Sequence, residues 1–452
     1  MEEEEAFFAR AIHTKAQALR LSVLELPGDA VRDLMWMTRL DCGSLKAWNK
    51  INVEIVVQVS PGESGSLIRL LKSLKNADYF SSPPPGLTVE LPPSVDEPTL
   101  HFLEDFAWPP SRSGNQQSGR PKLRRHMKRD ATAVESSLHF LESFFPANPS
   151  TSHVLILSPQ VELSPLFYHY IKYALLEYKY SLYGFQVSSK LAGIALNLPS
   201  TYMNASLSFD PPLAQPHDRD LSDPVPEGGQ ATPFLWQAPD SDAALYFGEK
   251  WIEFQDFLAS RLDTLRESPR PHKRPKATSP KYPPWMEYLS ELSCAMGYVM
   301  LYPNWESGGS FATAHYELTP QKADFTGADS ATDIEDERNV LITQPSMRLP
   351  REPPLISGTT LVRILPLDGD LPELSVVPLL SFDGRPVSRS AMDIEAAEYA
   401  AVFRREIGGC GFDIEVRNVG DLFCLGGRSG GDSTLESDTD ATPIPTTELG
   451  AQ

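Results

Sequence analysis

The sequence predicts an α/β protein in which a mostly parallel sheet is flanked by helices. Short β-branched runs alternate with amphipathic helical runs between residues 51 and 200, which is typical of right-handed crossovers between parallel strands. Apolar residues at helical spacing occupy residues 1–50, so we expect a helical N-terminal adaptor. Polar and proline-containing stretches dominate beyond residue 318 and predict a loop-rich C-terminal region.

The composition limits the class of protein. With 452 residues and 41% hydrophobic content, the chain can form one large domain or two ordinary ones. A net charge of −20 argues against a nucleic-acid partner, because phosphates favour basic surfaces. The four cysteines show no CxxC spacing, so a zinc site is not expected. The sequence is compatible with two disulfides and equally with four free thiols.

No apolar run approaches the roughly 20 residues that span a membrane, and the chain begins with the acidic MEEEE. We therefore expect no transmembrane segment. The location stays open between a cytoplasmic protein and a Golgi- or ER-associated one whose N-terminal anchor is missing here. The sequon Asn204-Ala-Ser206 would matter only in the secretory route.

The elements can be assigned in order. In the adaptor, Phe7, Phe8 and Ile12 follow helical spacing, and a second helical run covers Ala30–Leu40. Expected strands are Val53–Val59, Leu87–Leu91, Val154–Leu157, Val161–Leu163, Ala192–Leu196 and Tyr298–Leu301. Expected helices are Ser64–Leu74, Pro98–Phe106, Ala131–Phe145, one from Ser164, Glu249–Leu262, Pro284–Gly297 and one near Ala391–Ile407. Expected loops are Ser111–Asp130, residues 207–231 and much of 319–425, and residues 426–452 have the composition of a disordered tail.

One strand-to-helix passage stands out as a ligand-binding candidate. The buried run Val154–Leu157 ends abruptly in the polar turn Ser158-Pro159-Gln160, before the edge Val161–Leu163. Open α/β sheets bind ligands where strands end in such turns. The side chains of this turn therefore bear directly on function.

The segments NVEIVVQV, LTVEL, HVLILSPQVELSP and WMEYLSELSCAMGYVMLYPNW occur in an order that resembles family-two glycosyltransferases of the GT-A type. The segments LFYHYIKYALLEYKYS, LPSTYMNAS and PFLWQAPDSDAALYFGEKW are more closely similar to fungal family-two glycosyltransferase-like proteins. The resemblance covers roughly Ala30 to Leu318. It implies a GT-A-like domain over residues 51–318, with a nucleotide-sugar half (51–165) and an acceptor half (166–318).

The resemblance implies a set of donor contacts. The first strand and its turn would touch the nucleotide, and the second strand would reach the base; these positions are Val59, Ser60, Glu63 and Glu90. The turn after the next strand usually carries Asp-x-Asp, which holds Mn²⁺ or Mg²⁺ against the diphosphate. Here Ser158 and Gln160 stand in its place, with Pro159 between them. The first nearby acid is Glu162, which is either a metal ligand or a solvated, helix-capping acid.

An inverting transferase needs a general base on the acceptor side. The resemblance places this carboxylate at Asp242, with Asp240 and Glu253 as further candidates, although Pro-Asp-Ser-Asp is also ordinary turn chemistry. Trp251, Phe254 and Leu258 share one helical face, so we expect them in the core rather than against a sugar. The basic stretch Arg120–Arg129 could pair with a diphosphate, or it could simply be a solvated loop.

Two functions follow as hypotheses. The first is a glycosyltransferase that moves a sugar from a nucleotide-diphosphate donor to an unknown acceptor, with an unusual metal site or none. The alternative is a catalytically inactive GT-A-like protein kept as a binding or scaffold module, because fold alone does not establish function.

Overall fold

The computed structural model describes residues 2–21, 23–26, 30–59, 64–80, 84–110, 119–125, 133–184, 188–203, 207–213, 231–267, 278–279, 282–315 and 353–424. Among the sequence-predicted positions, Ser60, Glu63 and the sequon Asn204-Ala-Ser206 lie outside these residues, as do residues 126–129 of the basic stretch.

Nine strands of the described chain form one sheet in the order β11-β7-β9-β6-β8-β4-β1-β2-β3, and β5 pairs with β10 separately. The strands are β1 Asn52–Gln58, β2 Gly86–Leu91, β3 Lys122–Arg125, β4 Ser152–Leu157, β5 Val161–Leu163, β6 Leu191–Ala195, β7 Phe234–Trp236, β8 Ala243–Tyr246, β9 Val299–Tyr302, β10 Ala312–Ala314 and β11 Leu379–Leu380. Parallel pairing joins β3, β2, β1 and β4, whereas β8 runs antiparallel between β4 and β6. The predicted mostly parallel sheet is confirmed.

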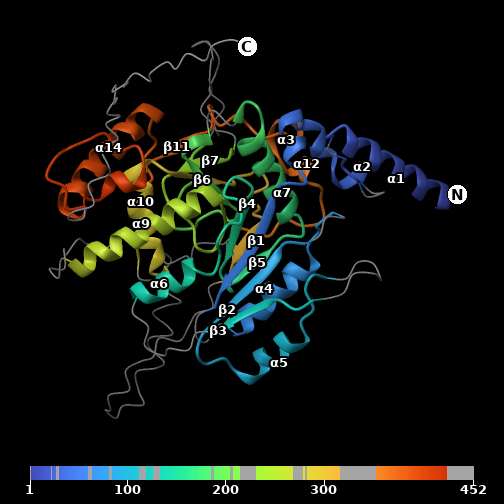
Figure 1. Ribbon diagram of the computed structural model, residues 1–452, viewed down its shortest axis with the longest axis horizontal. Helices are drawn as coiled ribbons and strands as arrows, with labels where there is room; N and C mark the ends of the chain where they lie inside the picture. The colour runs from blue at the N-terminus through green and yellow to red at the C-terminus, as the bar shows by residue number, and fades with distance from the viewer. Residues whose placement is uncertain are drawn as a thin grey trace, which may run out of the picture.

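Helices cover this sheet. The α-helices are α1 Glu2–Ala18, α2 Ala30–Asp33, α3 Cys42–Ala47, α4 Ser64–Asn76, α5 Glu97–Asp105, α6 Ala133–Leu141, α7 Phe167–Leu175, α9 Gly248–Glu267, α10 Trp285–Met296, α12 Leu361–Ile364, α13 Pro366–Gly369 and α14 Arg389–Glu406. Shorter turns are the 3₁₀ segments η1 Met35–Arg39, η3 Ser188–Lys190 and η4 Val419–Leu422, and the π-helical turn η2 Leu176–Tyr180. In Figure 1, α1 and α14 lie at opposite ends of the molecule.

The sheet separates two apolar cores. On β1, Ile55 and Val57 face the core shared with α4 and α7, whereas Val56 between them faces the core shared with α6, α9, α10 and α14. All three side chains are completely buried. Alternate residues of one strand point to opposite faces, so a strand covered on both sides is apolar throughout. This explains why the strands β1 and β4 could be predicted from the sequence.

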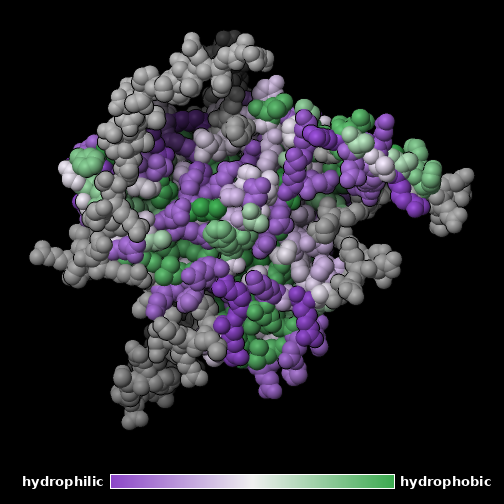
Figure 2. Space-filling view, viewed as in Figure 1, coloured by the Kyte–Doolittle hydropathy of each residue, from purple (hydrophilic) through white to green (hydrophobic). Residues whose placement is uncertain are grey.

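The N-terminal segment is helical as predicted, but its second helix is broken. The expected helix over Ala30–Leu40 is one turn of α-helix followed by η1. The break lets Trp36 enter the core, where its ring lies 5.5 Å from that of Trp48 and 5.3 Å from that of Tyr173 on α7. Hydrophobic residues gather at the protruding end of α1 (Figure 2), where Phe7 and Phe8 are 72% and 66% exposed.

Three further expectations need correction or completion. The stretch Ser111–Asp130 is not loop throughout, because β3 pairs with β2 within it. The helix expected from Ser164 begins at Phe167, because the Ser164 hydroxyl accepts a hydrogen bond from the Leu166 N–H in the preceding turn. Cys410 and Cys424 form a disulfide, whereas Cys42 and Cys294 are free. No helix in the described residues is long and apolar enough to span a membrane.

Candidate functional site

The sheet reverses its strand order beside β1. The chain builds β2 and β3 on one side of β1 and then places β4 on the other side. In open α/β sheets the ligand crevice lies outside the carboxyl ends of the strands at such a reversal. Here those ends lead into Val59 and Ser158. The carboxyl end of β6 lies at the same edge, as does the start of β8, because β8 runs antiparallel to both β4 and β6.

The turn Ser158-Pro159-Gln160 is present as predicted, immediately after β4. The Ser158 N–H donates to the carbonyl oxygen of Asp242 at 2.7 Å, and the Val161 N–H closes the turn onto the Ser158 carbonyl at 3.1 Å. The His315 N–H donates to the Gln160 carbonyl at 3.0 Å. None of the turn's side chains is a carboxylate, so the turn does not fit the metal that the family resemblance implies.

Glu162, the predicted metal ligand, lies on β5 opposite Thr313 of β10. Its Oε2 is 3.0 Å from Nε2 of His315, and its side chain is 38% exposed. Glu162 therefore already has a side-chain partner in His315. Within the described ranges, no group of three or more His, Cys, Asp and Glu is arranged to hold a metal.

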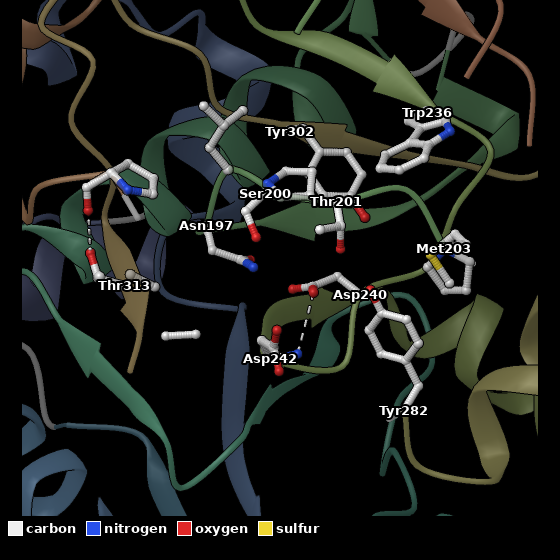
Figure 3. Close-up of a pocket in the computed structure, with 16 residues that line it drawn as sticks. Asn197, Ser200, Thr201, Met203, Trp236, Asp240, Asp242, Tyr282, Tyr302 and Thr313 are labelled. Atoms are coloured by element: carbon white, nitrogen blue, oxygen red, sulfur yellow. Dashed lines mark hydrogen bonds between the residues drawn. The ribbon is translucent and has the colours of Figure 1, made fainter. Parts of the chain in front are cut away.

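A small cavity of about 40 Å³, partly open to solvent, lies at this edge of the sheet. Figure 3 shows the side chains of Asn197, Asp240 and Asp242 converging within it. Asn197 follows β6, and the two aspartates precede β8. Trp236, Tyr282 and Thr313 also line the pocket. The structure thus brings together Asp240 and Asp242, the two catalytic candidates that the sequence placed in one turn.

Asp240 is held rigidly under the pocket and is only 8% exposed. Its carboxylate accepts hydrogen bonds from the backbone N–H groups of Asp242 at 3.3 Å and Ala243 at 3.0 Å. The Tyr246 hydroxyl donates to the Asp240 carbonyl at 2.6 Å. Burial, together with the nearby Asp242 carboxylate, raises the pKa of Asp240 to about 7. Perturbed carboxyl groups of this kind are characteristic of functional sites.

Asn197 is a site residue that sequence reasoning missed. It is 7% exposed, and its side chain hydrogen-bonds Asp240. Its Oδ1 is buried and has no hydrogen-bond partner in the described structure. Buried acceptors are almost always satisfied by a protein group or an ordered water, and Asn197 lines the pocket. The segment AGIALNLPS carries no motif that would have singled out Asn197.

Glu90 lies at the carboxyl end of β2, beside β1. Its carbonyl accepts a hydrogen bond from the Val59 N–H at 3.0 Å, so these two predicted nucleotide contacts are neighbours. Its carboxylate is 2% exposed and lies 3.1 Å from Nη1 of Arg124 on β3. Burial and the charge of Glu142 raise the pKa of Glu90 to about 7 despite Arg124. The Oε2 atom has no partner within the described structure.

Glu253 is not brought to this pocket. It lies on α9, where Lys250 Nζ approaches its Oε1 at 3.0 Å and the Tyr298 hydroxyl donates to its Oε2. Trp251 and Phe254 of the same helix are 1% and 0% exposed, so the predicted core role of this helical face is confirmed. Neither ring is available to a sugar.

Two family models match separate parts of the chain. The model described as SPBC1E8.03c N-terminal domain matches residues 1–48, and the one described as SPBC1E8.03c C-terminal domain matches residues 65–209. The first match ends just before β1, and the second contains the Ser158 turn and Asn197 but stops short of Asp240. No curated protein matches the chain.

Proposed function

We propose that this protein is a glycosyltransferase that moves a sugar from a nucleotide-diphosphate donor to an acceptor hydroxyl. The observation that carries the proposal is the position of Asp240 and Asp242. They lie against the turn after β4, at the edge of the sheet where its strand order reverses. The resemblance to family-two transferases described above supports the same class.

Asp242 is the proposed general base. It is half-buried beside the buried Asp240, and it lines the pocket. In the reaction the acceptor oxygen forms a bond to the anomeric carbon while the bond from that carbon to the phosphate oxygen breaks. The electron pair leaves with the nucleoside diphosphate, and the hydroxyl proton passes to the Asp242 carboxylate.

Val59 and Glu90 are proposed to contact the nucleotide. They lie at the carboxyl ends of the adjacent parallel strands β1 and β2, on the other side of β4 from β8 and β6. The unpartnered Glu90 Oε2 is a ready acceptor for an N–H group of a base or a hydroxyl of a ribose. Ser158 and Gln160 lie between this region and the pocket, at the position proposed for the diphosphate.

The test is turnover. The purified chain would be incubated with UDP- and GDP-sugars and candidate acceptors, and released nucleoside diphosphate and glycosylated product would be measured together. Equal amounts of both products, lost in Asp242→Asn, are the expected result. Glu253→Gln serves as the matched control, because Glu253 lies outside the pocket.

One observation favours a second function, a binding or scaffold module. The turn that usually supplies metal-binding carboxylates has none, and Glu162 is already paired with His315. On that alternative the chain binds a nucleotide sugar or a glycan without turnover. Saturable donor binding with no product across the acceptor panel would select it.

A further inference from the structure

The last turn of α14 holds a buried positive charge beside the disulfide. Arg404 is only 1% exposed. Its Nη2 atom donates to the Phe412 carbonyl at 3.1 Å and lies 3.8 Å from the Cys424 sulfur. Its Nε atom has no hydrogen-bond partner, and the guanidinium forms no ion pair with a carboxylate of the described chain. Because buried charges are normally paired, the guanidinium lacks a counter-charge while the disulfide is intact.

The disulfide can be approached from solvent at one of its two sulfurs. Cys410 is 5% exposed, whereas Cys424 is only partly buried. The segment between them is exposed over residues 411–415, and it returns to the core at Val419 and Leu422 of η4. A capping box within η4 fixes that turn independently of the disulfide. Opening the disulfide would therefore release the exposed segment from a covalent tie while η4 stays packed.

Reduction would supply the counter-charge that Arg404 lacks. A neighbouring arginine favours the thiolate form of a cysteine. The Cys424 sulfur already lies against the guanidinium, so its thiolate would form a charge pair there without rearrangement. Such a pair is stronger at a buried site than in water, because the effective dielectric constant is lower. The reduced state of this cysteine pair is thereby favoured relative to that of a pair without a cationic neighbour.

We propose that Cys410 and Cys424 form a thiol–disulfide exchange site for a dithiol reductant, in which Arg404 holds the Cys424 thiolate. One thiolate of the dithiol attacks the accessible Cys424 sulfur. The bond between the two protein sulfurs breaks, its electron pair leaves with Cys410, and Cys410 takes up a proton. The second thiol of the dithiol loses its proton to water and attacks its partner's sulfur in the mixed disulfide. Cys424 leaves as the thiolate, so the protein gains two electrons and the dithiol becomes a disulfide.

The exchange would act on a cleft of about 410 Å³ at this end of the molecule. Residues 414–417 of the cross-linked segment line the cleft, together with Met296 of α10 and Ala396 of α14. In Figure 1, α14 lies beside α10. Neither cysteine nor Arg404 lines the carboxylate pocket, so this inference does not depend on the proposed transferase.

The experiment measures how fast Cys424 is alkylated in the full chain. The folded protein would be reduced with dithiothreitol, freed of reductant and treated with iodoacetamide over a range of pH, and peptide mass spectrometry would follow each cysteine separately. We expect the Cys424 rate to reach half its maximum below about pH 7.5 in the folded chain and near pH 8.5 in urea. Cys42, an exposed free thiol, is the internal reference.

Substitutions at Arg404 assign the effect. Arg404→Met should raise the pH of half-maximal Cys424 alkylation by about one unit or more, whereas Arg404→Lys keeps the charge and should retain most of the wild-type value. The Cys42 profile should be the same in all three proteins. If Arg404→Met fails to fold, the comparison of the folded and urea-unfolded wild type, together with Arg404→Lys, decides the question.

Three results would overturn the proposal. The first is a disulfide that dithiothreitol reduces only in urea. The second is a Cys424 alkylation profile that is the same in the folded and unfolded wild type. The third is a folded Arg404→Met variant with the wild-type profile. None of these readouts involves a nucleotide sugar, so each leaves the proposed transferase untouched, and failure of sugar transfer would leave the exchange site untouched.

Discussion

The backbone N–H of Ser158 donates a 2.7 Å hydrogen bond to the carbonyl oxygen of Asp242. This bond joins the turn that lacks carboxylates to the segment that has two of them. The antiparallel pairing of β8 with β4 produces the bond, because it places the start of one strand beside the end of the other. The acidic side chains of the site therefore come from the segment before β8, where the sequence analysis placed the candidate general base, and not from the turn after β4.

Replacing Asp242 should separate chemistry from binding. Asp242→Asn removes the proton acceptor, and loss of a general base typically lowers turnover by about 100-fold or more. The change preserves size, so donor affinity should change little. Initial rates and donor affinities of both proteins check this. A variant that retains wild-type turnover would exclude Asp242 as the base.

We expect the ionised form of Glu90 to lower the free energy of unfolding at neutral pH. Its folded pKa of about 7 lies above the ordinary value of 4.5, so the wild-type protein loses stability as the pH rises from 4.5 through 7. Glu90→Gln should therefore raise the free energy of unfolding at pH 8 by roughly 1–3 kcal/mol. The gain should vanish near pH 4.5. Urea unfolding at the two pH values measures it, with the exposed Glu104→Gln as the control.

His153 should make the fold sensitive to acid. Its Nδ1 accepts a hydrogen bond from the Gly248 N–H at 3.2 Å, and its Nε2 lies 2.7 Å from the Tyr180 hydroxyl, so the ring is neutral. Burial lowers the pKa of His153 to about 3, and the charges of Lys179 and Lys172 act in the same direction. Stability from a depressed histidine is complete above pH 6.5 and is lost as the pH falls toward 3.

The measurement compares the wild type with His153→Gln. The variant should be less stable at pH 7, and the difference in unfolding free energy should shrink by roughly 3 kcal/mol between pH 7 and pH 4. His101→Gln provides the control, because the His101 side chain is 74% exposed. A difference that stays constant over this pH range would show that His153 is not held neutral.

The disulfide should stabilise the C-terminal region. Cys410 and Cys424 are 14 residues apart, and closing a loop of that size is worth about 3 kcal/mol. The double change Cys410→Ser with Cys424→Ser should lower the melting temperature, whereas Cys42→Ser, at an exposed free thiol, should not. If reductant lowers the melting temperature of the double variant as much as that of the wild type, the disulfide is not the cause.

The central strands were predictable because burial on both faces makes them apolar and β-branched, as in β1 and β4. The strands β3 and β8 gave no comparable signal. β3 reads Lys-Leu-Arg-Arg at an edge of the sheet. β8 is the four-residue run Ala-Ala-Leu-Tyr directly before α9, too short to show a period. Its place beside β4 depends on pairing between distant segments.

Only part of the site was predictable from the sequence. Asp240 and Asp242 could be picked out as acids within one turn, but Asn197 could not, because its role depends on β6 ending beside the start of β8. Glu253 shows the converse limit. Its helix was predicted correctly, but the contacts with Lys250 and Tyr298 that turn it away from the pocket are set by packing.

The central claim is that the edge carrying Asp240 and Asp242 binds a nucleotide sugar. Calorimetric titration of the purified chain with UDP- and GDP-sugars, with and without Mn²⁺, tests it most directly. We expect saturable binding of one donor class to the wild-type chain. A chain shown to be folded that binds no donor under either condition would contradict the claim.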